Sequence, residues 1–256
     1  MKEYTISKEY INNIEVKKLI DSINKGFLPK NVIYSNSRNV VWAEHVESVG
    51  KVAIKRFNYN FLKVINNIVA GKSRAQRAYD NSLILLENKF STPEPIAYID
   101  FKFLGIPITS VFITKYTDDR EIAELTEKGN NKYYDEATNA LAKLLADMHS
   151  MGIVYRDANP SNVLYHIEDD KVTLSLIDTN RMRIKTNVVY KEIIDELWRS
   201  TWSSATLTDV TYAYSKIRGY DPERLLKTVL AYKLKKENLR NKKRRMKSFF
   251  RSKDNK

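Results

Sequence analysis

Residues 152–164 read GIVYRDANPSNVL, and residues 174–178 read LSLID. Asp157 and Asn162 stand five positions apart, and Asp178 directly follows a short apolar run that is typical of a strand. Carboxylate and amide oxygens suit Mg²⁺, and a carboxylate can also accept the hydrogen bond of an attacking hydroxyl. The set therefore indicates chemistry on phosphate groups. Taken alone, the Asp–Asn spacing also suits a simple turn before Pro160.

A lysine upstream joins this set. Residues 52–55 read VAIK and predict an apolar strand that ends on Lys55. A lone lysine on such a strand often lies at a sheet edge or extends to water. In protein kinases, however, the same four residues place a lysine on the α- and β-phosphates of ATP.

The order of these residues resembles that of protein kinases. Residues 155–162 align with the kinase loop H-R-D-L-x-x-x-N, in which the aspartate is the base and the asparagine binds magnesium. Tyr155 takes the place of the histidine, and Thr179-Asn180 takes the place of Phe-Gly after the metal-binding aspartate. Residues 35–39, where kinases carry a glycine-rich phosphate flap, contain no glycine.

The kinase resemblance implies further nucleotide contacts. Kinases pair the strand lysine with an acid on the next helix, which the sequence predicts over residues 73–88. Asp80 is the expected partner and Glu87 the alternative. Residues 115–117 (Lys115, Tyr116 and Thr117) would form the hinge that binds adenine. The remaining expected contacts are Thr114 at the back of the pocket and Ala53 and Leu164 on the two faces of the ring.

Four segments together resemble the lipopolysaccharide core kinases, namely residues 52–55, 92–97, 155–162 and 176–181. The resemblance implies a eukaryotic-like kinase fold and ATP-dependent phosphorylation of a heptose or Kdo hydroxyl in the lipopolysaccharide inner core. It implies Lys55 and Asp157 as catalytic residues, and Asn162 and Asp178 as ligands of Mg²⁺.

The periodicity of the chain predicts strands mainly in its first half and helices mainly in its second half, an α+β pattern, and the kinase resemblance implies two lobes. The N-lobe (residues 1–114) is expected to be a small antiparallel sheet with a helix, and the C-lobe (118–232) to be mainly helical. The expected strands span residues 31–34, 40–46, 51–57, 96–103, 109–114, 163–166 and 171–177. The expected helices span residues 8–25, 73–88, 135–151, 188–199, 207–217 and 222–250.

Composition excludes several classes of protein. The 256 residues include no cysteine, which excludes disulfides, thiolate zinc sites and a cysteine nucleophile. No run approaches eighteen apolar residues, and the first residues lack the apolar region of a signal peptide. We therefore expect a cytoplasmic protein without a membrane span.

The positive charge is concentrated in residues 233–256. This tail holds twelve Lys and Arg against two acids, a net charge of +10 out of +13 for the chain. Leucines and phenylalanines accompany the charges, as in helices that lie on anionic membranes. We expect the tail to hold the protein at the inner face of the bacterial inner membrane, near a lipid-linked substrate. A solvated charged terminus is the alternative.

Three other functions compete with a sugar kinase. A protein serine/threonine kinase usually carries a lysine two residues after the base, where this chain has Asn159. A catalytically degraded pseudokinase would explain the glycine-free flap. A nucleic-acid-binding module would explain the tail, but the sequence lacks an aromatic-interleaved RNA motif. No nucleic-acid partner is therefore expected.

Overall fold

The computed structural model divides the chain into two compact units. The first unit joins Met1–Asp119 to the later segment Ser175–Arg181, and the second joins Arg120–Leu174 to Met182–Lys256. The structure describes residues 2–26, 32–36, 39–59, 64–65, 67, 71–127 and 131–253. Asp178 therefore belongs to the same unit as Lys55, although 123 positions separate them in the sequence.

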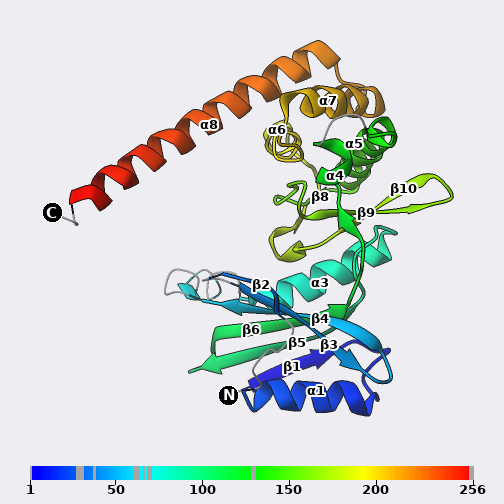
Figure 1. Cartoon of the computed structure of the whole chain (residues 1–256), viewed down its shortest axis with the longest axis vertical. Coiled ribbons are helices and arrows are strands. Elements are labelled where there is room, and N and C mark those ends of the chain that lie inside the picture. The colour runs from blue at the N-terminus through cyan, green and yellow to red at the C-terminus, as the bar shows by residue number, and fades with distance from the viewer. Residues whose placement is uncertain are drawn as a thin grey trace. The chain divides into compact units, whose positions relative to one another are not determined.

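A six-stranded sheet forms the centre of the first unit (Figure 1). The strands are β1 (Lys2–Ile6), β2 (Val32–Ser35), β3 (Asn39–Val46), β4 (Gly50–Asn58), β5 (Pro95–Phe103) and β6 (Ile106–Lys115). They lie in the order β1-β5-β6-β4-β3-β2, and every neighbouring pair is antiparallel. The sequence predicts all of them except β1, whose polar, exposed residues show little strand periodicity.

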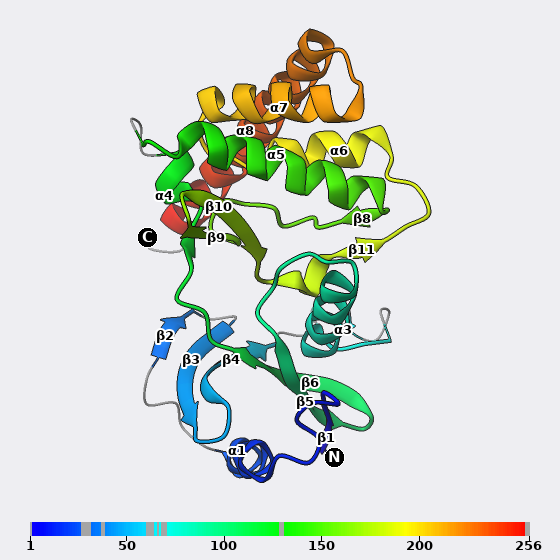
Figure 2. The same cartoon turned by 90° about the vertical axis from the view of Figure 1, so that its right-hand side faces the viewer.

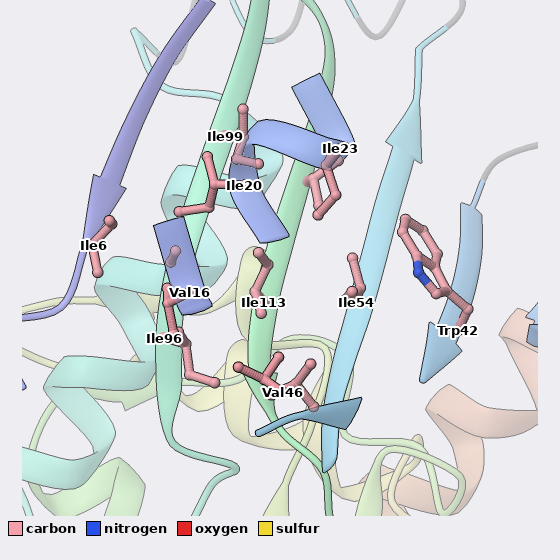
Figure 3. Packing of buried hydrophobic residues seen from close by; sticks show 13 residues of the cluster. Ile6, Val16, Ile20, Ile23, Trp42, Val46, Ile54, Ile96, Ile99 and Ile113 are labelled. Atoms are coloured by element: carbon pink, nitrogen blue, oxygen red, sulfur yellow. The ribbon is translucent and has the colours of Figure 1, made fainter. Parts of the chain in front are cut away.

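Two helices cover opposite faces of this sheet (Figure 1): α1 (Ile14–Asn24) and α3 (Arg74–Glu87). The Asn13 side chain accepts hydrogen bonds from the N–H groups of Glu15 and Val16, which caps the start of α1. Figure 3 shows apolar side chains of α1 interleaved with those of the sheet. The buried residues of this cluster include Val16, Ile20, Ile23, Trp42, Ile54, Ile99 and Ile113.

The side chains of β4 alternate between the two faces of the sheet, and Lys55 lies on the face that α1 does not cover. Ile54 packs in the cluster under α1, whereas Phe57 packs with Ala75 and Tyr79 of α3. Because successive side chains of a strand point to opposite faces, Lys55 lies on the same face as Phe57. The apolar cluster therefore decides which way the lysine points.

The second unit is mainly helical. Its helices are α4 (Ala123–Thr126), α5 (Tyr134–Ser150), α6 (Tyr190–Leu197), α7 (Ser204–Arg218) and α8 (Pro222–Lys253). Figure 2 shows α5, α6 and α7 side by side. Its strands are β7 (Arg120–Glu121), β8 (Ile153–Val154), β9 (Val163–Glu168), β11 (Arg183–Ile184) and β10 (Lys171–Leu176), whose last two residues belong to the first unit. None of the helices described combines the length and apolar sequence that a membrane span requires.

Gly152 ends α5 and directs the chain into residues 153–164. It has φ +74°, and a Cβ atom there would lie 1.9 Å from the carbonyl oxygen of Lys185. The Lys185 N–H donates to the Gly152 carbonyl at 2.9 Å, so the two backbones are held in contact. Only glycine fits this approach, because any Cβ would displace β11.

We expect Gly152→Ala to lower the free energy of unfolding by about 3 kcal/mol, since it adds a backbone clash to the strain of a positive φ. The matched control is Gly219→Ala, which has φ +70° but no atom within 4 Å of the added Cβ. The control should cost only about 1–2 kcal/mol. Urea unfolding followed by circular dichroism measures both values. Equal losses in the two variants would contradict the clash.

Candidate active site

Lys55 and Asp178 form an ion pair within the first unit. Lys55 Nζ lies 2.8 Å from Asp178 Oδ1, and both side chains are about one-fifth exposed. Burial on its own raises the pKa of the Asp178 carboxyl, but the positive charges of Lys55, Arg74 and Arg181 outweigh it and hold the pKa below its ordinary value. Asp178 is therefore ionised at neutral pH.

Helix α3 holds the segment that carries Asp178. Asn81 Nδ2 donates to the Thr179 carbonyl at 2.7 Å, and Ser82 Oγ lies 3.2 Å from Thr179 Oγ1. Asp178 itself adopts φ +61°, which is uncommon for a residue other than glycine and often marks a functional site. These contacts position the carboxylate against Lys55.

The structure contradicts the expected partner of Lys55. Asp80 Oδ2 lies 2.7 Å from Lys72 Nζ, so Asp80 forms a different ion pair. Among the described residues, the carboxylate within ion-pair distance of Lys55 is that of Asp178. A one-residue step turns a helical side chain by about 100°, so Asp80 points away from Thr179 while Asn81 points toward it. The alternative acid, Glu87, is exposed at the end of α3.

The residues expected around adenine share the sheet face of Lys55. Ala53 is directly opposite Thr114 in the β4–β6 register, and Lys55 is opposite Phe112. In the hinge, the Tyr116 N–H donates to the Lys51 carbonyl at 3.0 Å. The structure thus brings Ala53, Thr114 and Lys55 onto one surface; their role in nucleotide binding stays a prediction.

Lys115 and Leu164 are fixed by neighbours of their own. Lys115 Nζ pairs with Glu94 at 2.8 Å, and the Tyr10 hydroxyl donates to the same carboxylate at 2.7 Å. These contacts hold the end of β6 where the hinge begins.

In the second unit, Leu164 is buried and pairs in register with Glu121 of β7.

The second unit shapes the loop of Asp157 and Asn162 through its own hydrogen bonds. Asn162 Nδ2 donates to the Asp157 carbonyl at 2.9 Å, and the Asn159 N–H donates to the same oxygen at 2.7 Å. The fully buried Tyr155 donates its hydroxyl to the Asn162 carbonyl at 3.3 Å. Tyr155 therefore supports the loop from within the core, in the place where kinases have a histidine.

A buried polar group beneath this loop was not predicted from the sequence. The Arg156 N–H donates to Oε1 of Glu196, and the other oxygen of Glu196 lies 2.8 Å from His149 Nε2. His149 Nδ1 lies 2.8 Å from the Tyr214 hydroxyl, whose pKa burial raises. Three helices thus meet at the backbone one residue before Asp157. The sequence carries little signal for this group, because Glu196 directly follows Asp195 in a charged helix that also holds Glu192.

The donor atoms suit a magnesium ion. In the first unit Asp178 supplies an ionised carboxylate, and in the second unit the amide nitrogen of Asn162 donates to the Asp157 carbonyl; the role of Asp178 and Asn162 as metal ligands stays a prediction. The described residues contain no group of three His, Cys, Asp or Glu side chains that could bind a metal without further ligands. Mg²⁺ commonly takes only one or two protein oxygens and completes its shell with water and phosphates.

The fold and the residues together define a kinase-like phosphotransferase. The first unit has an antiparallel sheet with a strand lysine and a helix tied to an aspartate segment, and the second is helical with an Asp–Asn loop. A family model described as lipopolysaccharide kinase (Kdo/WaaP) matches residues 35–214, more than half of the chain. The chain therefore belongs to the lipopolysaccharide kinase (Kdo/WaaP) family.

A solved structure shares the fold of this chain. The structure of WaaP in complex with acyl carrier protein has a TM-score of 0.64 and 14% sequence identity, and the match covers 91% of this chain and 97% of that chain. The Rio2 kinase–ADP/Mg²⁺–phosphoaspartate complex from Chaetomium thermophilum has a TM-score of 0.47 and 11% sequence identity. This match covers 90% of this chain and 78% of that chain. The first likeness shows the fold alone, and the second is too low to support an argument. A search of curated proteins finds no match.

Proposed function

We propose that this chain transfers the γ-phosphate of ATP to a sugar hydroxyl of the lipopolysaccharide inner core, on a heptose or a Kdo residue. The observation that carries the proposal is the ion pair of Lys55 with an ionised Asp178, in a chain that belongs to this family. A strand lysine and an anionic oxygen ligand are the two groups that kinases use to hold a nucleotide and its metal.

Each residue has a defined role in the proposed reaction. Lys55 binds the α- and β-phosphates, while Asp178 and Asn162 would hold Mg²⁺, which neutralises phosphate charge when bound. Asp157 accepts the hydrogen bond of the sugar hydroxyl and orients it for attack. The hydrogen bonds that Asn159 and Asn162 make to the Asp157 carbonyl hold this residue in place.

Adenine would bind at the sheet surface of Ala53 and Thr114, with Leu164 on the other face of the ring. The Thr117 hydroxyl accepts the Asp119 N–H at 3.1 Å, which shapes the chain directly after the hinge. Lys115 and Tyr116 belong to the same hinge, and contacts with Glu94 and Lys51 hold them in position.

The test is phosphate transfer to a defined acceptor. The full chain would be incubated with Mg²⁺, radiolabelled ATP and deacylated inner-core oligosaccharide, and mass spectrometry would locate any new phosphate on heptose or Kdo. Lys55→Met serves as the inactive control. Transfer to protein substrates instead of the oligosaccharide would favour a protein kinase, and absence of transfer to either would reject the proposal.

We also propose that the C-terminal part of α8 attaches the protein to an anionic membrane surface. Leu225, Val229 and Lys233 are buried at four-residue spacing, so the first turns of α8 pack in the second unit. From residue 237 to 245 every side chain is exposed. The Phe249 and Phe250 side chains lie outside the described residues. Basic helices with apolar residues bind anionic bilayers, and each Lys or Arg near the surface contributes about 1 kcal/mol.

Removal of the residues after Asn241 is expected to reduce binding to anionic vesicles at least tenfold, because it deletes eight Lys and Arg. This cut spares Lys233, whose Nζ donates to the Trp202 carbonyl at 2.9 Å, and Arg240, which packs on the Trp198 ring. Pelleting with phosphatidylglycerol vesicles at low and high salt measures the effect. Equal pelleting of both chains at low salt, or pelleting that is insensitive to salt, would contradict it.

A further inference from the structure

A second cation lies beside Lys55 and Asp178. Arg74, the first residue of α3, places its guanidinium carbon 4.7 Å from the centroid of the Phe57 ring. Lys55 Nζ lies 5.3 Å from the same centroid. Both cations also contribute to the lowered pKa of Asp178. Two cationic side chains therefore lie against the buried Phe57 ring, next to the Asp178 carboxylate.

Amide groups on two sides orient Arg74. Its Nε donates to Asn180 Oδ1 at 3.3 Å, and its Nη1 donates to Asn39 Oδ1 at 3.5 Å. Asn180 comes two residues after Asp178, and Asn39 opens strand β3 at the end of the glycine-free flap. A guanidinium presents its N–H donors in a planar fork, a geometry that matches the oxygens of a phosphate group. Arg74 is half-buried, so part of its surface meets solvent.

The absence of glycine from residues 35–39 indicates a role for Arg74 in binding phosphates. In kinases the glycine-rich loop covers the phosphates of ATP. The chain has no glycine in residues 35–39, so the backbone there cannot approach phosphates as closely as a glycine-rich loop does, and a further cation would compensate. Arginine binds phosphate oxygens in a bidentate way and remains charged at any physiological pH.

We propose that Arg74 is a second cationic residue that binds the phosphates of the nucleotide, acting with Lys55 in place of the glycine-rich flap. The ligand class is a nucleoside di- or triphosphate, and the contact is to phosphates beyond the first. This inference rests on the proposed function, because it assumes that Lys55 and Asp178 hold a nucleotide.

The test compares Arg74→Gln with Lys72→Gln in the full chain. Lys72 lies two residues earlier and pairs with Asp80, so its removal deletes the same charge outside the proposed contact. Isothermal titration with Mg²⁺·ATP should show about tenfold weaker binding for Arg74→Gln and wild-type binding for Lys72→Gln. Titration with AMP should show equal affinity for all three proteins, because AMP lacks the outer phosphates. Arg74→Lys should bind Mg²⁺·ATP with intermediate affinity, since lysine keeps the charge but lacks the planar fork.

Each outcome decides the inference. Wild-type affinity of Arg74→Gln for Mg²⁺·ATP overturns it and leaves the proposed function intact. Parallel weakening of ATP and AMP binding, together with a lower melting temperature without nucleotide, shows a structural role and also overturns it. Failure of the wild-type chain to bind Mg²⁺·ATP overturns the proposed function and the inference together.

Discussion

Asp178→Asn is expected to lower phosphoryl transfer about a thousandfold, because the residue proposed to hold the metal against the transferred phosphate loses its negative charge. Asparagine keeps the size of the side chain and an oxygen that can accept from Lys55 at the present 2.8 Å separation, but it carries no charge. The loss should therefore appear as weaker Mg²⁺·ATP binding and a higher requirement for Mg²⁺. Steady-state kinetics at varied Mg²⁺ concentration measures both.

Asp80→Asn is the matched control for this variant. It makes the same substitution in the same unit, at the acid that pairs with Lys72 instead of Lys55. Its activity should stay within about twofold of the wild type, since surface ion pairs contribute only about 0–1 kcal/mol. Equal losses in Asp80→Asn and Asp178→Asn would show that the Lys55–Asp178 pair has no special role.

The same variant should change the response of stability to acid. The folded pKa of Asp178 is lowered, so its contribution to stability is present above the ordinary pKa of an aspartate and is lost as pH falls through the lowered value. Asp178→Asn should remove that part of the acid sensitivity. Urea unfolding of both proteins between about pH 6 and pH 3, across the ordinary pKa of aspartate, measures the difference.

Asp157→Ala is expected to lower kcat by about three orders of magnitude, with little change in the KM for ATP, because it removes the contact that we propose for the attacking hydroxyl. The bonds that shape its loop end on the Asp157 backbone carbonyl, which the substitution retains. The melting temperature should therefore stay close to that of the wild type.

Asp170→Ala is the control for the loss of one negative charge in the second unit. Asp170 lies in the β9–β10 turn of the same unit, where its carboxylate accepts the Tyr133 hydroxyl at 2.7 Å on the surface. It should retain full turnover. Wild-type turnover in Asp157→Ala would remove this residue from the proposed mechanism, and a large drop in melting temperature would assign it a structural role.

Much of the fold followed from local sequence patterns. The strand pattern of residues 52–55 and the helical periodicity of residues 73–88 and 135–151 are confirmed, and Gly219 ends α7 with a positive φ. These signals are local. The spacing of apolar residues, a capping residue and a glycine with positive φ each depend on residues that are only a few positions apart. β1 was missed because it lies at the sheet edge, where its exposed residues show no apolar face.

For the proposed site, the sequence predicts the residue types but not the pairing of the side chains. The sequence by itself determined that Lys55, Asp157, Asn162 and Asp178 occur in the order and spacing of a kinase, since each belongs to a short motif. Only the tertiary structure showed that Lys55 pairs with Asp178 rather than Asp80, and that Glu196 and His149 lie beneath the Asp157 loop. The residues that pair in these contacts are 40 to 123 positions apart in the chain. Whether Asp80 or its neighbour faces the Asp178 segment depends on the rotation of a single residue along α3. Packing sets such contacts, and no local pattern encodes them.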